Sequence, residues 1–495
     1  MQNINNFLLI GCLTRHSLFL NKKLDLKTPE KWKGEFKMVK QEKPIVKNNT
    51  YTLDIVSLGH SGEGVGKYEG FTVFVPHGLP GEQVEVTITE VKKSYAKGKL
   101  KAILKPIAAR CQPRCSIYYD CGGCQLQHVA YNEQLILKRQ TVIDAVTRIG
   151  KINDVIIHPT IGAEDSWYYR NKMQFPIGTV NGKVAVGCFA QGTHNIINTE
   201  HCYIQHEANN LVAQALQEIV TELGISTYDE RTGRGIIRHV LGRVGTATDE
   251  VMVVLVTATP ELPHKERIIA HLRQRVPNLV SVIQNINSNK TNVILGNRTR
   301  TLWGENYITD TLGEFTFHIS ARSFFQVNTK QAEVLYNKAV EYAGLSGEET
   351  VIDAYCGTGT ITLFLARHAK KVYGIEIVAP AIRDAQHNAQ MNQISNVEFI
   401  VGDAVDSMPK MFKEGIRPQV IVVDPPRAGC DKLVLETFAA MQAKRIVYVS
   451  CNPSSLARDL ALLEELGYKT QEIQPIDMFS HTYHVEVVCK LVKME

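Results

Sequence analysis

A short apolar strand that runs into a glycine turn constrains this chain more than any other feature. Residues 351–354 form the strand, residues 355–359 form a turn that contains Gly357 and Gly359, and residues 361–368 show a helical pattern. A strand, a tight turn and a helix N-terminus make the nucleotide-binding corner of a doubly wound sheet. Glycine lets the backbone approach a ligand closely. The sequence therefore predicts an open, mostly parallel sheet with a ligand site at this corner.

An acidic residue follows the second predicted strand of this sheet. This strand covers residues 372–375, and Glu376 follows it, about 20 residues after the first strand. An acid at this distance can accept hydrogen bonds from ribose hydroxyls. The turn lacks the full G-x-G-x-x-G fingerprint of a dinucleotide site. It reads D-A-Y-C-G-T-G and resembles the first motif of class I S-adenosylmethionine methyltransferases. A third strand ends near Asp403, for which an adenine contact and a helix N-cap remain alternatives.

A second motif lies at the end of the buried strand predicted over residues 420–423, which runs into Asp424-Pro425-Pro426-Arg427. Two prolines cannot continue a sheet, so the chain must turn outward at the carboxyl end of the strand, where such folds bind ligands. Methyltransferases that act on amino groups place an aromatic residue after a D/N-P-P motif, to stack on the target base. Arg427 occupies that position here, which argues against methylation of an amine.

A cysteine follows the next predicted strand, residues 446–450, and precedes an Asn-Pro turn. Cys451 is thus placed at the carboxyl end of a strand, where its thiol can attack a bound substrate. The alternative is a small buried apolar residue, the commonest fate of a free cysteine. That alternative is the expectation for four other cysteines: Cys188, Cys356, Cys430 and Cys489.

Methylation of uracil at C5 gives such a thiol a chemical purpose, because C5 is a poor nucleophile. Attack by Cys451 at C6 breaks the conjugation of the ring and gives C5 enolate character. A base must then remove the C5 proton so that the cysteine can leave. Glu486 alternates with apolar neighbours on a late predicted strand and is our candidate base. A salt-bridged structural acid is the alternative, and His481 and His484 are expected to be structural or to line the substrate site.

The first part of the chain has a different pattern. Residues 48–107 combine alternating strands with closely spaced glycines, which predicts a small β-barrel. The net charge of +5 is small for 495 residues, so any basic surface must be local. The last barrel segment has a run of lysines with no acid among them: Lys92, Lys93, Lys97, Lys99, Lys101 and Lys105. Two interpretations remain open, a solvated edge strand and a face that contacts phosphates.

The chain contains eleven cysteines, an odd number in a protein long enough for two to four domains. This usage predicts a reducing, cytoplasmic compartment, with cysteines used for metal binding or catalysis. Residues 110–128 are rich in cysteine, and residues 131–149 show the pattern of an amphipathic helix. Residues 1–47 lack sustained periodicity and are expected to be a disordered leader, or the result of a start assigned upstream of Met38. The apolar run 7–13 is far shorter than the about 20 residues that span a bilayer, so no membrane partner is expected.

Together the motifs resemble the RNA uracil-C5 methyltransferase family over about residues 48–495. The matching pieces are Phe324-Phe325-Gln326-Val327-Asn328, residues 353–359, Gly374-Ile375-Glu376, Asp424-Pro425-Pro426-Arg427, Ser450-Cys451-Asn452-Pro453 and His484-Val485-Glu486. The resemblance implies that four residues contact S-adenosylmethionine or organise its site: Gln326, Tyr355, Glu376 and Asp424. It implies that Cys451 is the nucleophile and Glu486 the proton acceptor. It also implies that the barrel is a TRAM domain, which binds RNA.

The ribosomal branch of that family carries a [4Fe–4S] cluster, and the resemblance implies four cysteine ligands here: Cys115, Cys121, Cys124 and Cys202. The first three match the clustered family spacing C-x5-C-x2-C, and four thiolates are the expected donor set of such a cluster. Zinc is the alternative, because four cysteines serve it equally well. Cys111 is expected to be a spare. The expected role of the cluster is structural or in RNA docking, because methyl transfer needs no electron.

The predicted architecture is α/β: a Rossmann-like class I methyltransferase domain over residues 313–495, preceded by the TRAM barrel over 48–107 and an α+β, iron–sulfur-bearing central domain over 108–312. The predicted function is formation of 5-methyluridine in 23S ribosomal RNA by a monomer. The barrel and the cysteines favour ribosomal RNA, because the transfer-RNA branch resembles the catalytic part without them. A transfer-RNA enzyme remains the nearest alternative. A non-catalytic RNA-binding assembly factor is disfavoured by the presence of both Cys451 and Glu486.

Overall fold

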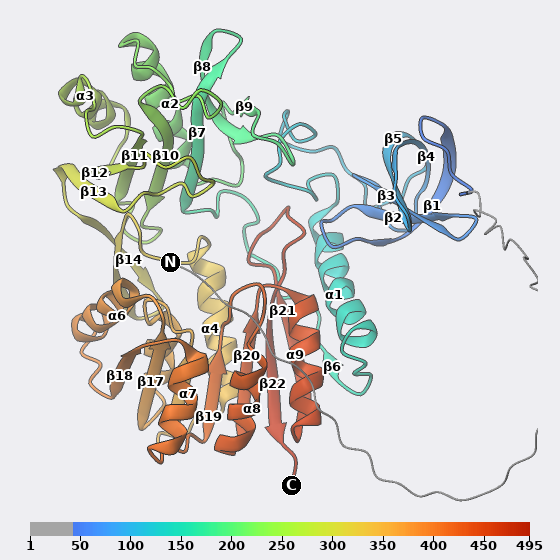
Figure 1. The fold of residues 1–495 in the computed structure, drawn as a ribbon, viewed down its shortest axis with the longest axis vertical. Helices are drawn as coiled ribbons and strands as arrows, with labels where there is room; N and C mark the ends of the chain where they lie inside the picture. Colours follow the sequence, from blue (N-terminus) through green and yellow to red (C-terminus); the bar gives the residue numbers. More distant parts are fainter. Residues whose placement is uncertain (1–42) are drawn as a thin grey trace, which may run out of the picture. The chain divides into compact units, whose positions relative to one another are not determined.

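An eight-stranded sheet forms the carboxyl-terminal part of the computed structural model, which describes residues 43–495 (Figure 1). The strands lie in the order β18–β17–β16–β19–β20–β22–β21–β6. The first five are parallel, and β22 runs antiparallel to both β20 and β21. Their bounds are β6 (Ile156–Ile157), β16 (Thr350–Ala354), β17 (Lys371–Glu376), β18 (Val397–Val401), β19 (Val420–Val423), β20 (Arg445–Ser450), β21 (Tyr468–Ile476) and β22 (Glu486–Lys493). The predicted open, mostly parallel sheet is confirmed.

The central strands of this sheet are apolar along their whole length because both faces are covered. In β19, Val420 and Val422 pack in the core that contains α4 and α5, whereas Ile421 and Val423 pack in the core beneath α7, α8 and α9. The helices are α4 (Thr329–Ala343), α5 (Thr360–Ala366), α6 (Ala379–Met391), α7 (Ala404–Lys413), α8 (Lys432–Met441) and α9 (Pro453–Glu465). The alternation of side chains along a strand thus divides one apolar run between two cores.

A closed five-stranded barrel lies at the amino-terminal end of the described residues. Its strands are β1 (Thr50–Leu58), β2 (Gly64–Tyr68), β3 (Phe71–Val75), β4 (Gln83–Val91) and β5 (Tyr95–Lys105). Apolar side chains such as Leu53, Val73 and Val86 fill its interior. The predicted barrel is therefore confirmed. Of the predicted leader, residues 1–42 lie outside the part of the chain that the structure describes.

A seven-stranded sheet lies between these parts in the sequence, in the order β13–β12–β11–β10–β7–β8–β9. Its strands are β7 (Lys172–Val180), β8 (Lys183–Phe189), β9 (Ile196–Asn198), β10 (Ile237–Val244), β11 (Val251–Thr257), β12 (Leu279–Ile286) and β13 (Arg298–Gly304). Helices α2 (Glu207–Glu222) and α3 (Lys265–Arg275) pack with it. The hairpin of β14 (Tyr307–Leu312) and β15 (Phe315–Ser320) spans the point where we predict the catalytic domain to begin.

Helix α1 (Tyr131–Arg148) agrees closely with the helix predicted after the cysteine-rich segment. It lies beside α9, and the strand β6 that follows it pairs with β21 (Figure 1). Part of the segment predicted as central domain thus extends the carboxyl-terminal sheet. Pro44–Glu495 form one compact unit by their contacts.

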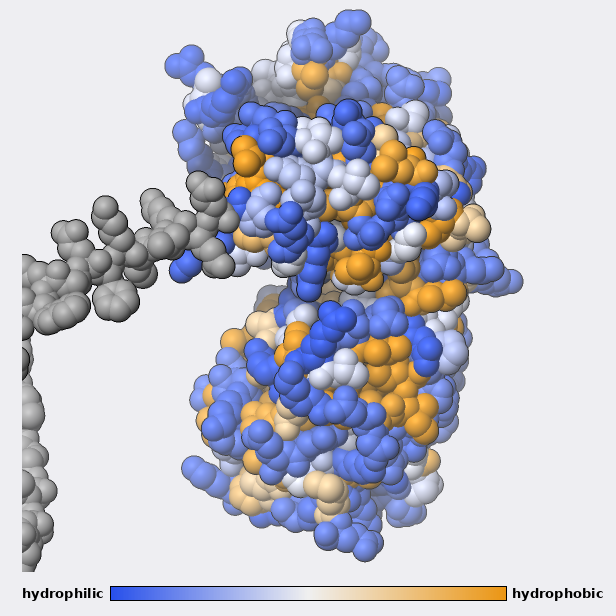
Figure 2. All heavy atoms as spheres, turned by 90° about the vertical axis from the view of Figure 1, so that its right-hand side faces the viewer, coloured by the Kyte–Doolittle hydropathy of each residue, from blue (hydrophilic) through white to orange (hydrophobic). Residues whose placement is uncertain are grey.

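The surface and the helix lengths carry two further observations. Figure 2 shows mostly hydrophilic side chains on the face that it presents, with hydrophobic patches between them. Within residues 43–495, no helix combines the length and the apolar composition that crossing a membrane requires.

Candidate active site

The carboxyl ends of the parallel strands bring the predicted cofactor residues together. Ala354 at the end of β16 pairs with Ile375 of β17, so Tyr355 and Glu376 follow side by side. Ala354 also pairs with Val423 of β19, so Asp424 follows on the other side of Tyr355. Three residues that are far apart in sequence therefore meet at one edge of the sheet, where ligands bind in folds of this kind.

The pairing of β20 with β22 brings together the two residues predicted to perform the chemistry. Ser450, the last residue of β20, pairs with Val487 in an antiparallel register. The next pair in that register is Cys451 and Glu486, because one strand ends where the other begins. The thiol and the carboxyl group thus belong to adjacent strands at the same edge of the sheet.

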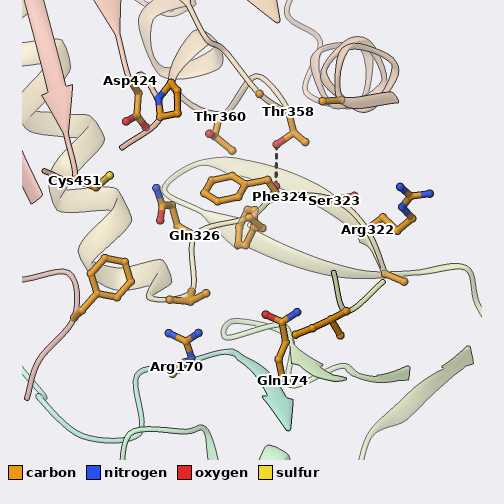
Figure 3. Close-up of a pocket in the computed structure, with 18 of the residues that line it drawn as sticks. Arg170, Gln174, Arg322, Ser323, Phe324, Gln326, Thr358, Thr360, Asp424 and Cys451 are labelled. Atoms are coloured by element: carbon orange, nitrogen blue, oxygen red, sulfur yellow. Dashed lines mark hydrogen bonds between the residues drawn. The ribbon is translucent and has the colours of Figure 1, made fainter. Parts of the chain in front are cut away.

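The residues that follow these strand ends line one cavity of about 1730 Å³, together with Glu486. The predicted site residues in its wall are Gln326, Tyr355, Glu376, Asp424, Cys451 and Glu486. Figure 3 shows Gln326 and Phe324 projecting into the cavity between Asp424 and Cys451 on one side and Arg170 and Gln174 on the other. The cavity therefore has walls from both the carboxyl-terminal sheet and the seven-stranded sheet.

The glycine turn forms the cofactor corner of this cavity. The carboxylate of Glu376 accepts hydrogen bonds from the Gly357 N–H at 3.2 Å and the Val378 N–H at 2.8 Å. Tyr355 has φ of 68°, a left-handed conformation that is rare for a bulky residue and recurs where a site requires it. The backbone therefore fixes the orientation of the Glu376 carboxylate before a ligand is bound.

The sequence predicts that Asp403 either caps a helix or contacts the adenine ring of a ligand. Its side chain caps α7 by accepting a hydrogen bond from the Val405 N–H at 3.0 Å. It also lies in the wall of the cavity. The helix N-cap is therefore confirmed, and contact with a ligand remains a prediction.

Three acidic groups near the strand ends have no cation that neutralises them: Asp353 and Glu486 are buried, and Asp424 is half-buried. Burial raises the pKa of Asp424 to about 6. Burial, together with the Asp424 carboxylate, raises the pKa of Glu486 to about 8, and Arg427 opposes this shift only in part. Burial also raises the pKa of Asp353 to about 7, although Thr362 donates a hydrogen bond to its carboxylate at 2.5 Å. Such clustered shifts are typical of functional sites.

Glu486 is only 5% exposed, and its carboxylate has no hydrogen-bond or ion-pair partner among residues 43–495. The interpretation as a salt-bridged structural acid is therefore not supported. An unpartnered buried carboxyl group is costly to the fold, which favours a chemical purpose.

The thiol of Cys451 is half-buried and is not activated by its surroundings. Burial and the carboxyl groups of Glu486 and Asp424 raise its pKa to about 11, while Arg427 lowers it. The thiol is therefore protonated at neutral pH. A cation bound beside these carboxyl groups would favour the thiolate by simple attraction.

The two histidines near Glu486 differ in position. His484 lines the cavity, and burial lowers its pKa to about 4, so the ring is neutral. His481 is buried outside the cavity wall and stacks on Trp167, with ring centroids 3.6 Å apart.

Three further residues in the cavity wall are Phe324, Arg170 and Gln174. The sequence indicated no role for them beyond the motif that contains Phe324, because their place in the wall depends on the packing of distant segments.

The four cysteines predicted as metal ligands also line this cavity. They are close enough for each to influence the ionisation of another, as Cys124 and Cys202 do. Nevertheless, no group of three or more Cys, His, Asp or Glu side chains within residues 43–495 is arranged to hold a metal ion. Cys121 instead lies close enough to Cys188 for each thiol to shift the pKa of the other, whereas we expected Cys188 to be an inert packing residue. The predicted metal centre, and with it an iron–sulfur-bearing central domain, is therefore not confirmed.

The remaining cysteines agree better with expectation. Cys356, Cys430 and Cys489 are buried. Cys111 is exposed, lies outside the cavity wall and donates a weak hydrogen bond to the Gln127 carbonyl at 3.5 Å. All cysteines among the described residues are free thiols.

Comparison with known families decides the class of the protein. The family described as tRNA (Uracil-5-)-methyltransferase matches residues 158–494, and the TRAM domain family matches residues 47–101. The chain belongs to the RNA uracil-5 methyltransferase family. As a member of it, the protein is an S-adenosylmethionine-dependent RNA methyltransferase with an RNA-binding TRAM barrel.

Relatives match this uracil-5 methyltransferase over almost its whole length. An "Uncharacterized RNA methyltransferase" of Clostridium tetani (strain Massachusetts / E88) is 52% identical over 450 residues, which cover 91% of this chain and 98% of the relative. One of Bacillus cereus (strain ATCC 10987 / NRS 248) is 49% identical, with 92% and 99% covered. The solved structure of Pyrococcus abyssi tRNA (uracil-54, C5)-methyltransferase in complex with S-adenosyl-L-homocysteine is 28% identical, with a TM-score of 0.72, covering 89% of this chain and 100% of that one.

Proposed function

We propose that this protein methylates C5 of a uridine in 23S ribosomal RNA, with Cys451 as nucleophile and Glu486 as general base. The observation that carries the proposal is the register of β20 and β22. It makes a half-buried thiol and an unpartnered buried carboxyl group neighbours in the wall of one cavity. An amine-methylating enzyme would have no use for either group at this position.

The proposed reaction begins at C6 of the uracil ring. The Cys451 thiol gives its proton to solvent, and its sulfur forms a bond to C6 while the C5–C6 double-bond electrons move to form an enolate. C5 then bonds to the methyl group, whose bond to the donor sulfur would break and leave its electron pair on that sulfur. Glu486 removes the proton from C5, the double bond is restored, and the C6–sulfur bond breaks to return the thiolate. A base with a pKa of about 8 is well matched to proton removal near neutral pH.

S-Adenosylmethionine, when bound, supplies the methyl group from a positively charged sulfur. Four residues would hold it or organise its site: Gln326, Tyr355, Glu376 and Asp424. The walls fit such a ligand, because Glu376 presents a carboxylate whose orientation the backbone N–H groups fix. The acidic surroundings of Asp424 also favour a cation over an anion at this edge of the sheet.

RNA is expected to contact the barrel as well as the cavity, and the target base must be flipped out of its stack to reach Cys451. The side chains of Lys97, Lys99 and Lys101 project from β5 toward solvent. Lys101 pairs with Glu85 at 3.2 Å, and Lys97 lies 3.9 Å from Glu90. The acids of β4 thus neutralise part of the lysine run, so we propose moderate rather than dominant phosphate binding by this face.

Transfer RNA is the second candidate substrate. The P. abyssi enzyme, which is named for a transfer-RNA uracil, covers 89% of this chain. The presence of a barrel and of a central segment in this chain therefore does not distinguish a ribosomal-RNA enzyme from a transfer-RNA enzyme. The cysteine-rich segment beside the cavity keeps ribosomal RNA as our first choice, in a cytoplasmic monomer.

We also propose that Cys115, Cys121, Cys124 and Cys202 hold a [4Fe–4S] cluster, with zinc as the alternative. Four free thiols that face one cavity provide the right donor set. Binding requires the Cys121 side chain to leave Cys188. Iron and acid-labile sulfide should be measured on protein purified without oxygen. Protein that holds neither iron nor zinc when purified in that way would remove the proposal.

Two experiments test the proposed function. Cys451→Ala should abolish methyl transfer to total RNA while S-adenosylmethionine still binds, as measured by calorimetry; retained activity would refute the mechanism. Mapping 5-methyluridine in RNA from cells with and without the protein should reveal a site in 23S ribosomal RNA that depends on it. A loss in transfer RNA instead would select the second candidate.

A further inference from the structure

The connection between β21 and β22, residues 477–485, leads directly into Glu486 and is held by residues outside both strands. Phe479, Thr482 and His484 from this connection line the cavity together with Glu486. The connection contains no helix or strand of its own. Its shape must therefore come from contacts with its neighbours.

A buried ion pair holds the start of this connection. Lys138 of α1 donates to the Asp477 carboxylate, and the two side chains are 1% and 0% exposed. The same ammonium group donates to the Phe479 carbonyl at 3.0 Å. The hydroxyls of Tyr131 and Ser480 donate to the other carboxylate oxygen at 2.6 and 2.7 Å. Every oxygen of this carboxylate is thereby satisfied.

The middle of the connection is held through His481. Its backbone N–H donates to the side-chain carbonyl of Gln134 on α1 at 3.0 Å, and the Gln134 amide lies 3.2 Å from the His481 ring nitrogen. The N–H groups of Gln125 and Leu126, which directly follow Cys124, donate to the His481 carbonyl at 3.0 and 2.9 Å. His481 has φ of 66°, a conformation that persists only where the surroundings impose it.

The contacts at Cys451 come from different elements. Cys451 lies between β20 and the start of α9, and Asn452 caps that helix by accepting from the Ser454 N–H at 3.1 Å. Side chains of α1 bond to the 477–485 connection through Lys138 and Gln134, and Arg139 donates to the carbonyls of Ile157 and His158; none of these bonds reaches the Cys451 turn. Lys138 and Gln134 thus make polar contacts with the segment before the base and not with the turn that carries the nucleophile, although α1 also packs beside α9.

We propose that Lys138 and Gln134 of α1 are positioning residues for Glu486, acting through the 477–485 connection. The inference rests on the proposed function, since it assumes that Glu486 removes the C5 proton. A buried ion pair is weak evidence for stability, because apolar residues of similar volume can replace such pairs. We infer that this ion pair instead fixes the geometry of the segment that leads into Glu486.

The consequence is specific to one step of the reaction. Cys451 attack and methyl transfer precede proton removal, and neither Lys138 nor Gln134 makes a hydrogen bond with the Cys451 turn. Weakening the α1 contacts should therefore slow the last step and leave RNA bound to Cys451 through the C6–sulfur bond. A variant that is merely less stable has no reason to accumulate this adduct.

The test uses the full-length protein with S-adenosylmethionine. The substrate is total RNA from cells that lack this protein. Lys138→Met should lower kcat by about tenfold to a hundredfold, the cost of a small misplacement. The apparent KM for RNA should fall along with kcat, because the slowed step follows methyl transfer and the adduct accumulates. A protein–RNA adduct that resists denaturation by detergent should accumulate. Lys138→Arg, which keeps the charge, should restore most of the rate. Gln134→Met should show a weaker form of the same behaviour, and it carries the test if Lys138→Met does not fold.

Controls separate this inference from the function on which it rests. Arg110 and Glu82 form another ion pair, at 2.6 Å, in which Glu82 is buried and Arg110 is partly buried. Arg110→Met should lower thermal stability without accumulation of the adduct. Glu486→Gln should give the largest amount of adduct. If Glu486→Gln accumulates adduct but neither α1 variant does, positioning by α1 is wrong. If the wild-type protein makes no 5-methyluridine and Glu486→Gln makes no adduct, the proposed function itself fails.

Discussion

Asp477 and Glu486 lie at the two ends of one connection, and both are buried, yet their surroundings are opposite. Asp477 is paired with Lys138 and receives hydroxyl hydrogen bonds. Burial acts to raise the pKa of Asp477, but Lys138 and these hydrogen bonds outweigh it and hold the pKa below its ordinary value. Glu486 has no such partner, and its pKa rises to about 8. A compensated acid organises the fold, and an uncompensated one is available for chemistry.

Neutralising each acid in turn should give the largest contrast. Asp477→Asn leaves the Lys138 ammonium buried without its partner, so we expect a loss of about 3–5 kcal/mol in the free energy of unfolding. Glu486→Gln removes an unpaired buried acid, so we expect stability to be unchanged or higher while turnover is lost. Urea denaturation of the two variants and the wild type measures both effects. Similar losses of stability for both variants would contradict the distinction.

The pH dependence of stability should sharpen the same contrast. The pKa of Glu486 rises from 4.5 to about 8 on folding, so this group weakens the wild-type fold progressively as pH increases through that interval. The stability advantage of Glu486→Gln should therefore grow from about pH 5 to pH 8 and then level off. Asp477, whose pKa is lowered, stabilises the fold above its ordinary pKa and loses this effect in acid. Thermal melting of the wild type and Glu486→Gln from pH 5 to 9 measures this advantage. A difference in melting temperature that does not change with pH would mean that Glu486 is paired.

A smaller effect is expected at Arg427, the cation that acts on both reactive groups. Arg427 lowers the pKa of Cys451 and opposes the rise in the pKa of Glu486. Arg427→Gln should therefore reduce the rate of Cys451 alkylation by iodoacetamide at pH 8.5 by about two- to tenfold, because fewer molecules carry a thiolate. Mass spectrometry can follow Cys451 and the exposed Cys111 in the same sample. Equal slowing at both thiols, or none at Cys451, would exclude the effect of Arg427.

The smallest effect is expected at Tyr131, one of the hydroxyl donors to Asp477. Tyr131→Phe removes this bond and the acceptor of the Ala163 N–H, but keeps the ion pair and most of the packing. We expect a loss of about 1 kcal/mol in the free energy of unfolding. A loss as large as that of Asp477→Asn would mean that the hydroxyl, and not Lys138, compensates the acid.

The catalytic edge could be predicted because strands and turns are local. Each apolar run and the Gly, Pro or acidic residue that ends it can be read within a few positions, as at Asp424 and Glu376. The helix after the cysteine-rich segment was also predictable from its periodicity. That helix, however, belongs with the carboxyl-terminal sheet, and no local pattern indicates such a long-range contact.

The charges at the site could not be predicted in the same way. Nothing in the sequence near Asp477 shows that it meets a lysine more than three hundred positions away, as the pair of Lys138 and Asp477 does. The cysteine prediction depended on the resemblance to the ribosomal branch of the family, in which three of the four cysteines match the spacing. Spacing brought the thiols to one cavity, but the orientation of Cys121 toward Cys188 depends on the packing of β8.

The sequence by itself determined the elements of this protein: a barrel, an open parallel sheet, and a cysteine and an acid at strand ends. These follow from side-chain periodicity and turn chemistry, which act over a few residues. Only the tertiary structure decided that β22 runs antiparallel beside β20, so that Glu486 faces the position of Cys451. It also decided that Asp477 is paired and Glu486 is not, because burial and charge pairing depend on residues that folding brings together from distant parts of the chain.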